Sequence, residues 1–136
     1  MQYKDNEFCL LQDLALQYSH NKRGIMKELK KQIKDFIQAR DWAQYHAPKN
    51  LVMALSVEVA EIVEIFQWKE SDQKLTNEEV EGLRQEIGDV LVYLLELADH
   101  YEIDIIQAAR DKMVLNEEKY PAELVKGKAW KYTEYE

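Results

Sequence analysis

The amino-acid sequence predicts an all-α fold with a four-helix core. Apolar residues recur every three or four positions along most of the chain, which is the period of an amphipathic helix. Only four glycines and two prolines occur in 136 residues, so few positions break a helix. We predict no strand, because no segment shows the alternating pattern that a strand requires.

A short helix is expected before the core, from about Phe8 to Tyr18. Asn21 and Gly24 follow it and indicate a break in the chain. We therefore divide the sequence into an N-terminal helical extension, residues 1–23, and a single functional domain, residues 24–136.

The core helices follow one another with short breaks. We expect them at Ile25–Tyr45, Leu51–Lys69, Glu78–Tyr101 and Asp104–Lys119. Pro48 ends the first of them, and Asn50 is a suitable N-cap for the second. The polar stretch between residues 70 and 77 is short, so the second and third helices should be antiparallel neighbours.

The fourth helix has signals at both ends. Asp104 followed by Gln107 resembles a capping box at its start, and Pro121 closes it. Residues 122–136 are aromatic and charged without a helical period, and we assign no element there.

Four carboxylates lie where apolar side chains are expected. Glu58 is in the middle of the apolar stripe of the second core helix, and Glu86 is in the middle of the stripe of the third. Glu61 and Asp89 each follow one turn later, so each helix presents two acids three residues apart. Both pairs should therefore face inward and meet across the interface between the two helices.

An inward group of acids needs a cation. Four such carboxylates would repel one another and resist ionisation without one. The donors are all oxygen, with no histidine at the spacing that di-iron and di-manganese bundles use. Such donors favour Mg²⁺, with Mn²⁺ as an alternative, over zinc or copper, and Mg²⁺ also binds substrate phosphates. The pattern thus predicts a phosphate-containing substrate, and the other interpretation is two solvated helix faces that carry acids.

Composition argues against several classes of protein. With 26 acidic and 18 basic residues the chain has a formal charge of −8, which argues against a nucleic-acid partner. No run of 18 apolar residues or secretory signal is present, so we expect no membrane association. The single cysteine, Cys9, excludes an internal disulfide and fits a reducing compartment, so we expect a cytoplasmic protein.

The sequence also resembles a known family. The strings that carry the resemblance occur in order along the chain: Arg40-Asp41-Trp42, His46-x-Pro48-x-Asn50, Glu58-x-x-Glu61, Phe66-Gln67-Trp68, Glu86-x-x-Asp89-Val90, Tyr93 and Lys131-Tyr132-Thr133. Together they resemble the MazG-like all-α NTP pyrophosphatase family, and within it the dCTP pyrophosphatase branch. The resemblance covers residues 25–136.

The resemblance implies a Mg²⁺-dependent pyrophosphohydrolase that cleans the nucleotide pool. Its substrate would be a dNTP, with dCTP or a modified dCTP favoured, cleaved between the α and β phosphates to the monophosphate and pyrophosphate. The protein would be a homodimer or homotetramer with sites where subunits pair. Its metal ligands would be Glu58, Glu61, Glu86 and Asp89. The positions that match substrate-binding residues are Trp42, Trp68, Tyr93, Lys112 and Asn116, and Ile33 replaces a pocket histidine of the animal enzymes.

In this chemistry one carboxylate takes a proton from the attacking water, and Glu61, at the edge of its stripe, is our candidate for that catalytic role. His46 is expected to shape the loop between helices rather than bind a ligand. Two other functions stay open from the residues alone. One is a non-catalytic helical interaction module, and the other is a di-metal carboxylate bundle that uses iron.

Overall fold

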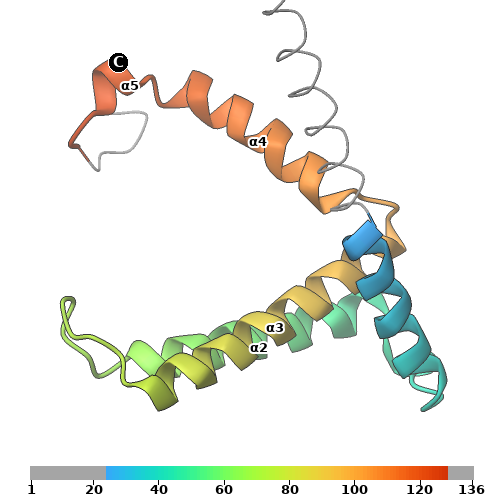
Figure 1. The fold of residues 1–136 in the computed structure, drawn as a ribbon. Helices are drawn as coiled ribbons and strands as arrows, with labels where there is room; N and C mark the ends of the chain where they lie inside the picture. The colour runs from blue at the N-terminus through green and yellow to red at the C-terminus, as the bar shows by residue number, and fades with distance from the viewer. Residues whose placement is uncertain (1–23, 129–136) are drawn as a thin grey trace, which may run out of the picture.

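A computed structural model describes residues 24–128, and every regular element in that part of the chain is a helix. The predicted all-α class is therefore confirmed. Figure 1 shows the arrangement of these elements. In chain order they are a helix over residues 24–38, η1 (Ala43–Tyr45), α2 (Pro48–Phe66), α3 (Asn77–His100), α4 (Ile105–Lys119) and α5 (Ala122–Val125). The predicted extension, residues 1–23, lies outside the described residues.

Helices α2 and α3 form an antiparallel hairpin, which is the most extensively packed pair of elements in the described part of the chain. Leu51 of α2 and Leu95 and Ala98 of α3 are its buried apolar side chains. Leu51 belongs to the apolar stripe that also contains Glu58, so the stripe does face the neighbouring helix, as the sequence predicted. This hairpin is the scaffold that positions the acidic residues.

The first core helix ends earlier than predicted, at residue 38 rather than at Tyr45. The chain leaves the helix through a left-handed residue, Asp41, with φ of 54°. The Asp41 and Trp42 amides bond back to the carbonyls of Gln38 and Ile37, at 3.1 Å each, in the pattern of a Schellman motif. Glycine usually occupies this position, so an aspartate gives only a weak signal in the sequence.

Our prediction that Asn50 caps the second core helix is wrong. The N-cap is Ala47, and Pro48 occupies the first turn, where a missing N–H is tolerated. Asn50 instead donates from Nδ2 to the Tyr45 carbonyl at 2.8 Å, which ties the start of α2 to η1. The side chain therefore stabilises the preceding loop rather than the helix terminus.

Helix α3 begins at Asn77, one residue before the predicted Glu78, because Thr76 and Glu79 form a full capping box. The Thr76 Oγ1 accepts from the Glu79 amide at 3.2 Å, and the Glu79 carboxylate accepts from the Thr76 amide at 2.8 Å. A second Schellman motif ends the helix, with Glu102 at φ of 54°. Thr-x-x-Glu is a capping signal that can be read in the sequence, although Thr76 lies in the stretch that we predict as a loop.

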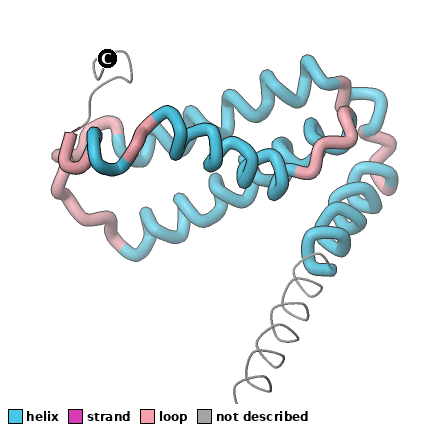
Figure 2. The backbone as a smooth tube through the Cα atoms, turned by 90° about the horizontal axis from the view of Figure 1, so that it is seen from above, coloured by secondary structure: helices cyan, strands magenta, loops and turns pink. Residues whose placement is uncertain are grey.

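Helix α4 begins as predicted. The Asp104 Oδ1 accepts from the amides of Ile106 and Gln107, each at 3.0 Å, so Asp104 is its N-cap. Beyond its first turns α4 diverges from the hairpin (Figure 1), so the four predicted core helices do not close into a bundle within one chain. Figure 2 shows the same elements from above, as helices joined by loops. The short helix α5 follows Pro121, although we assigned no element to that segment.

Apolar stripes with a seven-residue spacing are left exposed. On α2 the stripe is Val52, Val59 and Phe66, with exposed fractions of 44 to 47%. The others, also exposed, are Val80, Ile87, Leu94 and Tyr101 on α3, and Ile106 and Met113 on α4. A seven-residue apolar repeat is the pattern of helices that pack against other helices. Within the described residues no helix is long and apolar enough to cross a membrane.

Candidate active site

The hairpin brings the four predicted acids together. Carboxylate oxygens of Glu58, Glu86 and Asp89 all lie within 4.8 Å of one another. Glu61 completes the group, since its charge acts on Glu58 and it both repels and hydrogen-bonds Glu86. Glu58 and Glu86 are half-buried, whereas Glu61 and Asp89 are exposed. The group is therefore open to solvent on one side, where a substrate can enter.

Among residues 24–128, no ion pair places a positive charge on this acid cluster. Partial burial raises the pKa of Glu58, and repulsion from the other three acids raises it further. Burial raises the pKa of Glu86, and the neighbouring carboxylates of Glu61 and Asp89 raise it further. The ion pairs of residues 24–128 involve other carboxylates. A bound cation would remove this repulsion.

Tyr93 lies beside the acid cluster, one turn after Asp89 on α3. The ring is half-buried, and this burial is the main cause that raises the pKa of the Tyr93 hydroxyl. The negative charges of Glu58, Glu96 and Asp89 raise it further. The phenol is therefore held neutral as a hydrogen-bond donor next to the carboxylates. Glu96 was missed in the sequence, although its position one turn after Tyr93 and two turns after Asp89 places it on the same face.

Trp42 lies in the loop before α2 and is 44% exposed. Its indole meets the Phe36 ring edge-on, with centroids 5.8 Å apart. The Arg40 guanidinium lies 3.6 Å from the Phe36 centroid and 5.9 Å from that of Trp42. One face of the indole is thus supported by the protein, while much of the ring stays available for stacking.

Trp68 lies just after α2 and is 89% exposed. Two other predicted substrate-binding residues are not brought to the acids within one chain. Lys112 and Asn116 lie in the second half of α4, which diverges from the hairpin that carries the acids (Figure 1). A role for these residues therefore requires either a second subunit or a bound substrate.

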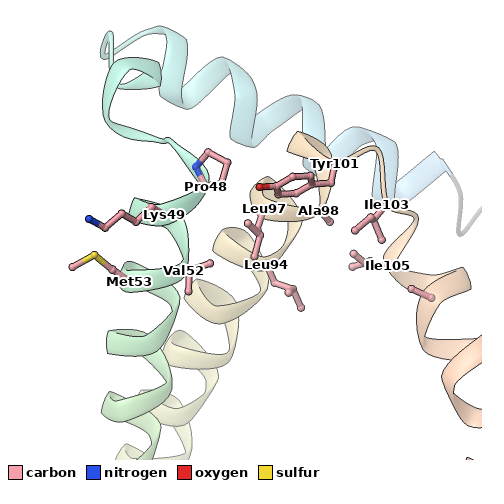
Figure 3. A pocket seen from close by; sticks show the side chains of 11 residues that line it. Pro48, Lys49, Val52, Met53, Leu94, Leu97, Ala98, Tyr101, Ile103 and Ile105 are labelled. Atoms are coloured by element: carbon pink, nitrogen blue, oxygen red, sulfur yellow. The ribbon is translucent and has the colours of Figure 1, made fainter.

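Two cavities lie beside the acid cluster rather than at it. The larger, of about 750 Å³, lies between the start of α2, the end of α3 and the start of α4, and its walls are almost wholly apolar (Figure 3). The second, of about 440 Å³, lies between the 24–38 helix and α3. Its polar lining includes Lys34, Gln38, Glu96 and His100.

The donor set fits a hard divalent cation. Carboxylates of Glu58, Glu86 and Asp89 converge closely enough for one ion to reach all three, and they offer only oxygen. Within the described part of the chain they are partly buried and have no ion-pair partner, which is a destabilising arrangement that a cation would offset. The cluster can therefore hold a divalent metal together with phosphate oxygens.

Comparison with known proteins agrees with this geometry. The model of the MazG-like family matches residues 53–134, which include both acidic pairs. The chain belongs to the MazG-like family. Among its relatives, dCTP pyrophosphatase 1 of Bos taurus is 36% identical over 121 residues, covering 86% of this chain and 72% of the relative. The same enzyme of Mus musculus is 39% identical over 113 residues, covering 80% of this chain and 66% of the relative.

A solved structure that resembles this chain is also a pyrophosphatase. A pyrophosphatase from Archaeoglobus fulgidus is 46% identical to the MazG-like chain, with a TM-score of 0.62, and the match covers 71% of this chain and 92% of that one. The family and the enzyme class expected from the sequence are thereby confirmed, and the protein is a nucleoside triphosphate pyrophosphatase.

Proposed function

We propose that this MazG-like protein is a Mg²⁺-dependent pyrophosphohydrolase of dNTPs that favours dCTP or a modified dCTP and removes it from the nucleotide pool. The observation that carries the proposal is the convergence of three carboxylates within 4.8 Å, on a helical hairpin with a neutral phenol beside them. The names of the relatives support dCTP as the substrate, because the two described above are both dCTP pyrophosphatase 1.

In this proposal Glu58, Glu61, Glu86 and Asp89 hold Mg²⁺, with Mn²⁺ as a substitute. When bound, the cation would draw charge from the phosphates and acidify a water molecule. Glu61 is the proposed general base. It is exposed at the edge of the acid cluster, so its carboxylate can face both a water and the other acids. Tyr93 would donate a hydrogen bond to a phosphate oxygen, because its hydroxyl is held neutral.

The nucleoside would be bound by aromatic side chains. Trp42 offers an exposed ring face, and stacking on such a ring contributes about 1–3 kcal/mol per base, whatever the base. Ile33 lines the smaller cavity and supplies no hydrogen bond. We therefore expect a pyrimidine preference with measurable activity on a second dNTP rather than strict selection of one base.

We further propose that the chain works as a homodimer or homotetramer. The stripes of α2, α3 and α4 leave apolar side chains about half-exposed at a seven-residue spacing. The larger cavity lies where these stripes converge, since Val52, Leu94 and Tyr101 all line it (Figure 3). A second copy that packs there would cover the exposed apolar surface, and its α4 could bring Lys112 and Asn116 to the acid cluster.

The activity is tested by incubating the protein with each dNTP and Mg²⁺ in ¹⁸O-labelled water. We expect pyrophosphate as the released product and the ¹⁸O label in the monophosphate, because the water attacks the α phosphorus. Glu61→Gln should abolish turnover. Glu64→Gln is the matched control, because Glu64 is an exposed acid one turn later on α2 and outside the acid cluster. Stepwise release of orthophosphate, or full turnover by Glu61→Gln, would contradict the proposal.

A further inference from the structure

A hydrogen bond between two side chains joins the loop that carries Trp42 to the helix that carries Glu86 and Asp89. The His46 Nδ1 lies 2.5 Å from the Glu96 Oε2, and the two side chains are only 19% and 11% exposed. A carboxylate can only accept, so Nδ1 carries the hydrogen. Glu96 lies one turn after Tyr93 on the face of α3 that bears the acids. The pair therefore links the loop directly to the active face.

A second hydrogen bond holds the same loop. The His100 Nε2 lies 2.8 Å from the His46 carbonyl oxygen, so this nitrogen donates to the backbone of the loop. His46 is thus held to α3 twice, through its side chain by Glu96 and through its main chain by His100. Both partners also line the smaller cavity, between the 24–38 helix and α3.

The loop is internally rigid, so fixing His46 also fixes Trp42. The His46 amide bonds to the Ala43 carbonyl at 3.2 Å, and the Tyr45 amide bonds to the Trp42 carbonyl at 2.8 Å. The Trp42 amide closes the motif that ends the preceding helix, through its bond to Ile37. The three residues of η1 thus separate the anchor from the indole, with no unbonded stretch between them.

We propose that His46 and Glu96 are positioning residues that hold the Trp42 indole at a fixed place relative to the acid cluster of α3. The proposal rests on the proposed function, in which Trp42 stacks on the base. Neither side chain needs to touch the substrate. Loss of the pair would let the loop move away from α3, and the substrate would lose its stacking partner while the metal-binding carboxylates stayed in place.

The kinetic test compares His46→Ala with His46→Asn. The asparagine Nδ2 can occupy the place of the imidazole Nδ1 and donate to Glu96, whereas alanine cannot. We expect His46→Ala to raise KM for the preferred dNTP roughly tenfold, within the range of one lost aromatic stack, with kcat within about twofold. His46→Asn should restore KM. A fall in kcat at unchanged KM, or equal KM values for the two variants, would overturn the proposal.

A double variant tests whether the two residues act as one unit. Glu96→Gln keeps the length of the side chain and an amide oxygen that can accept from Nδ1, so it should raise KM less than His46→Ala does. In the pair His46→Ala with Glu96→Gln, KM should be no higher than in His46→Ala alone. Additive increases in KM would mean that the two residues act separately and would overturn the proposal.

The matched control is Lys69→Gln. Lys69 and Glu79 form an ion pair at 2.6 Å whose side chains are also poorly exposed, at 14% and 33%. This ion pair joins the turn after α2 to the start of α3 and does not hold the loop that carries Trp42. We expect Lys69→Gln to lower the melting temperature without changing KM. If it raised KM as much as His46→Ala does, the effect would be one of general stability, and the positioning role would be wrong.

A measurement without substrate separates this proposal from the proposed function. With Trp68 and Trp130 replaced by phenylalanine, acrylamide quenching of fluorescence reports on Trp42 alone. We expect His46→Ala to increase the quenching constant about twofold or more and His46→Asn to leave it unchanged. Unchanged quenching in His46→Ala would overturn the positioning role. A protein that hydrolyses no dNTP, but shows the increase in quenching, would overturn the proposed function alone.

Discussion

Replacing Val52 tests whether the exposed stripes form a subunit interface. Val52 is 47% exposed and lies in the larger cavity, where the stripes of α2 and α3 meet the start of α4 (Figure 3). Burying one methyl group stabilises by about 0.8 kcal/mol, and Val52→Ala removes two of them. The Val52 side chain is already about half-buried within one chain. Burial of the other half by a partner would therefore stabilise the pair by roughly 0.8 kcal/mol per subunit.

In a two-fold symmetric pair Val52 contributes twice, so the alanine variant should weaken association by about 1.5 kcal/mol, roughly tenfold in Kd. Val52→Asp places an unpaired charge in the same apolar site, at a further cost of several kcal/mol, and should yield monomers. Sedimentation velocity over a dilution series measures both effects, and activity should fall together with assembly if subunits share the site.

Leu124→Asp is the control, because Leu124 is 53% exposed on α5 and belongs to none of the three stripes. It should leave the sedimentation coefficient unchanged. The proposed interface fails as an explanation if the wild-type chain is an active monomer at micromolar concentration. It fails equally if Val52→Asp sediments and turns over as the wild type does.

Three further results are expected. In the absence of metal, the wild type should gain stability as the pH falls from 7 toward 4.5. The pKa values of Glu58 and Glu86 are raised in the folded state, so protonation of these two carboxylates favours folding and their ionisation at higher pH opposes it. Glu58→Gln should flatten this pH dependence in thermal melts and abolish turnover. Glu102→Gly should stabilise the fold by about 1 kcal/mol in urea titrations, since glycine adopts a positive φ without strain. Thr76→Ala should cost about 1 kcal/mol in the same assay through the lost capping bond, and an unchanged midpoint would refute the cap.

The hairpin and its acids could be predicted because the information for them is local. An acid in the middle of an apolar stripe is visible from helical spacing alone, and a short polar loop between two helices leaves few ways to arrange them. Glu58 and Glu86 lie together for these two reasons. Helix ends were harder to predict where a residue other than glycine takes the left-handed conformation, as Asp41 does.

The surroundings of the acids could not be predicted in the same way, because they depend on contacts between distant residues. His46 and Glu96 are 50 residues apart, and no spacing rule relates a loop to a helix at that separation. The direction of α4 is a stronger example. Its capping residue was readable, yet its course depends on what covers Met113 and the other apolar residues of its stripe, which one chain does not bury.

The proposed site is divided between two levels of structure. The acid cluster is complete within the hairpin, because its carboxylates come from two helices joined by a short loop. Lys112 and Asn116, which are expected to contact the rest of the nucleotide, lie on α4, which the hairpin does not hold. We therefore expect metal binding to survive in a Val52→Asp monomer while nucleotide affinity is lost. Isothermal titration with Mn²⁺ and with a non-hydrolysable dCTP analogue measures the two separately, and loss of both together would show that assembly also shapes the acid cluster.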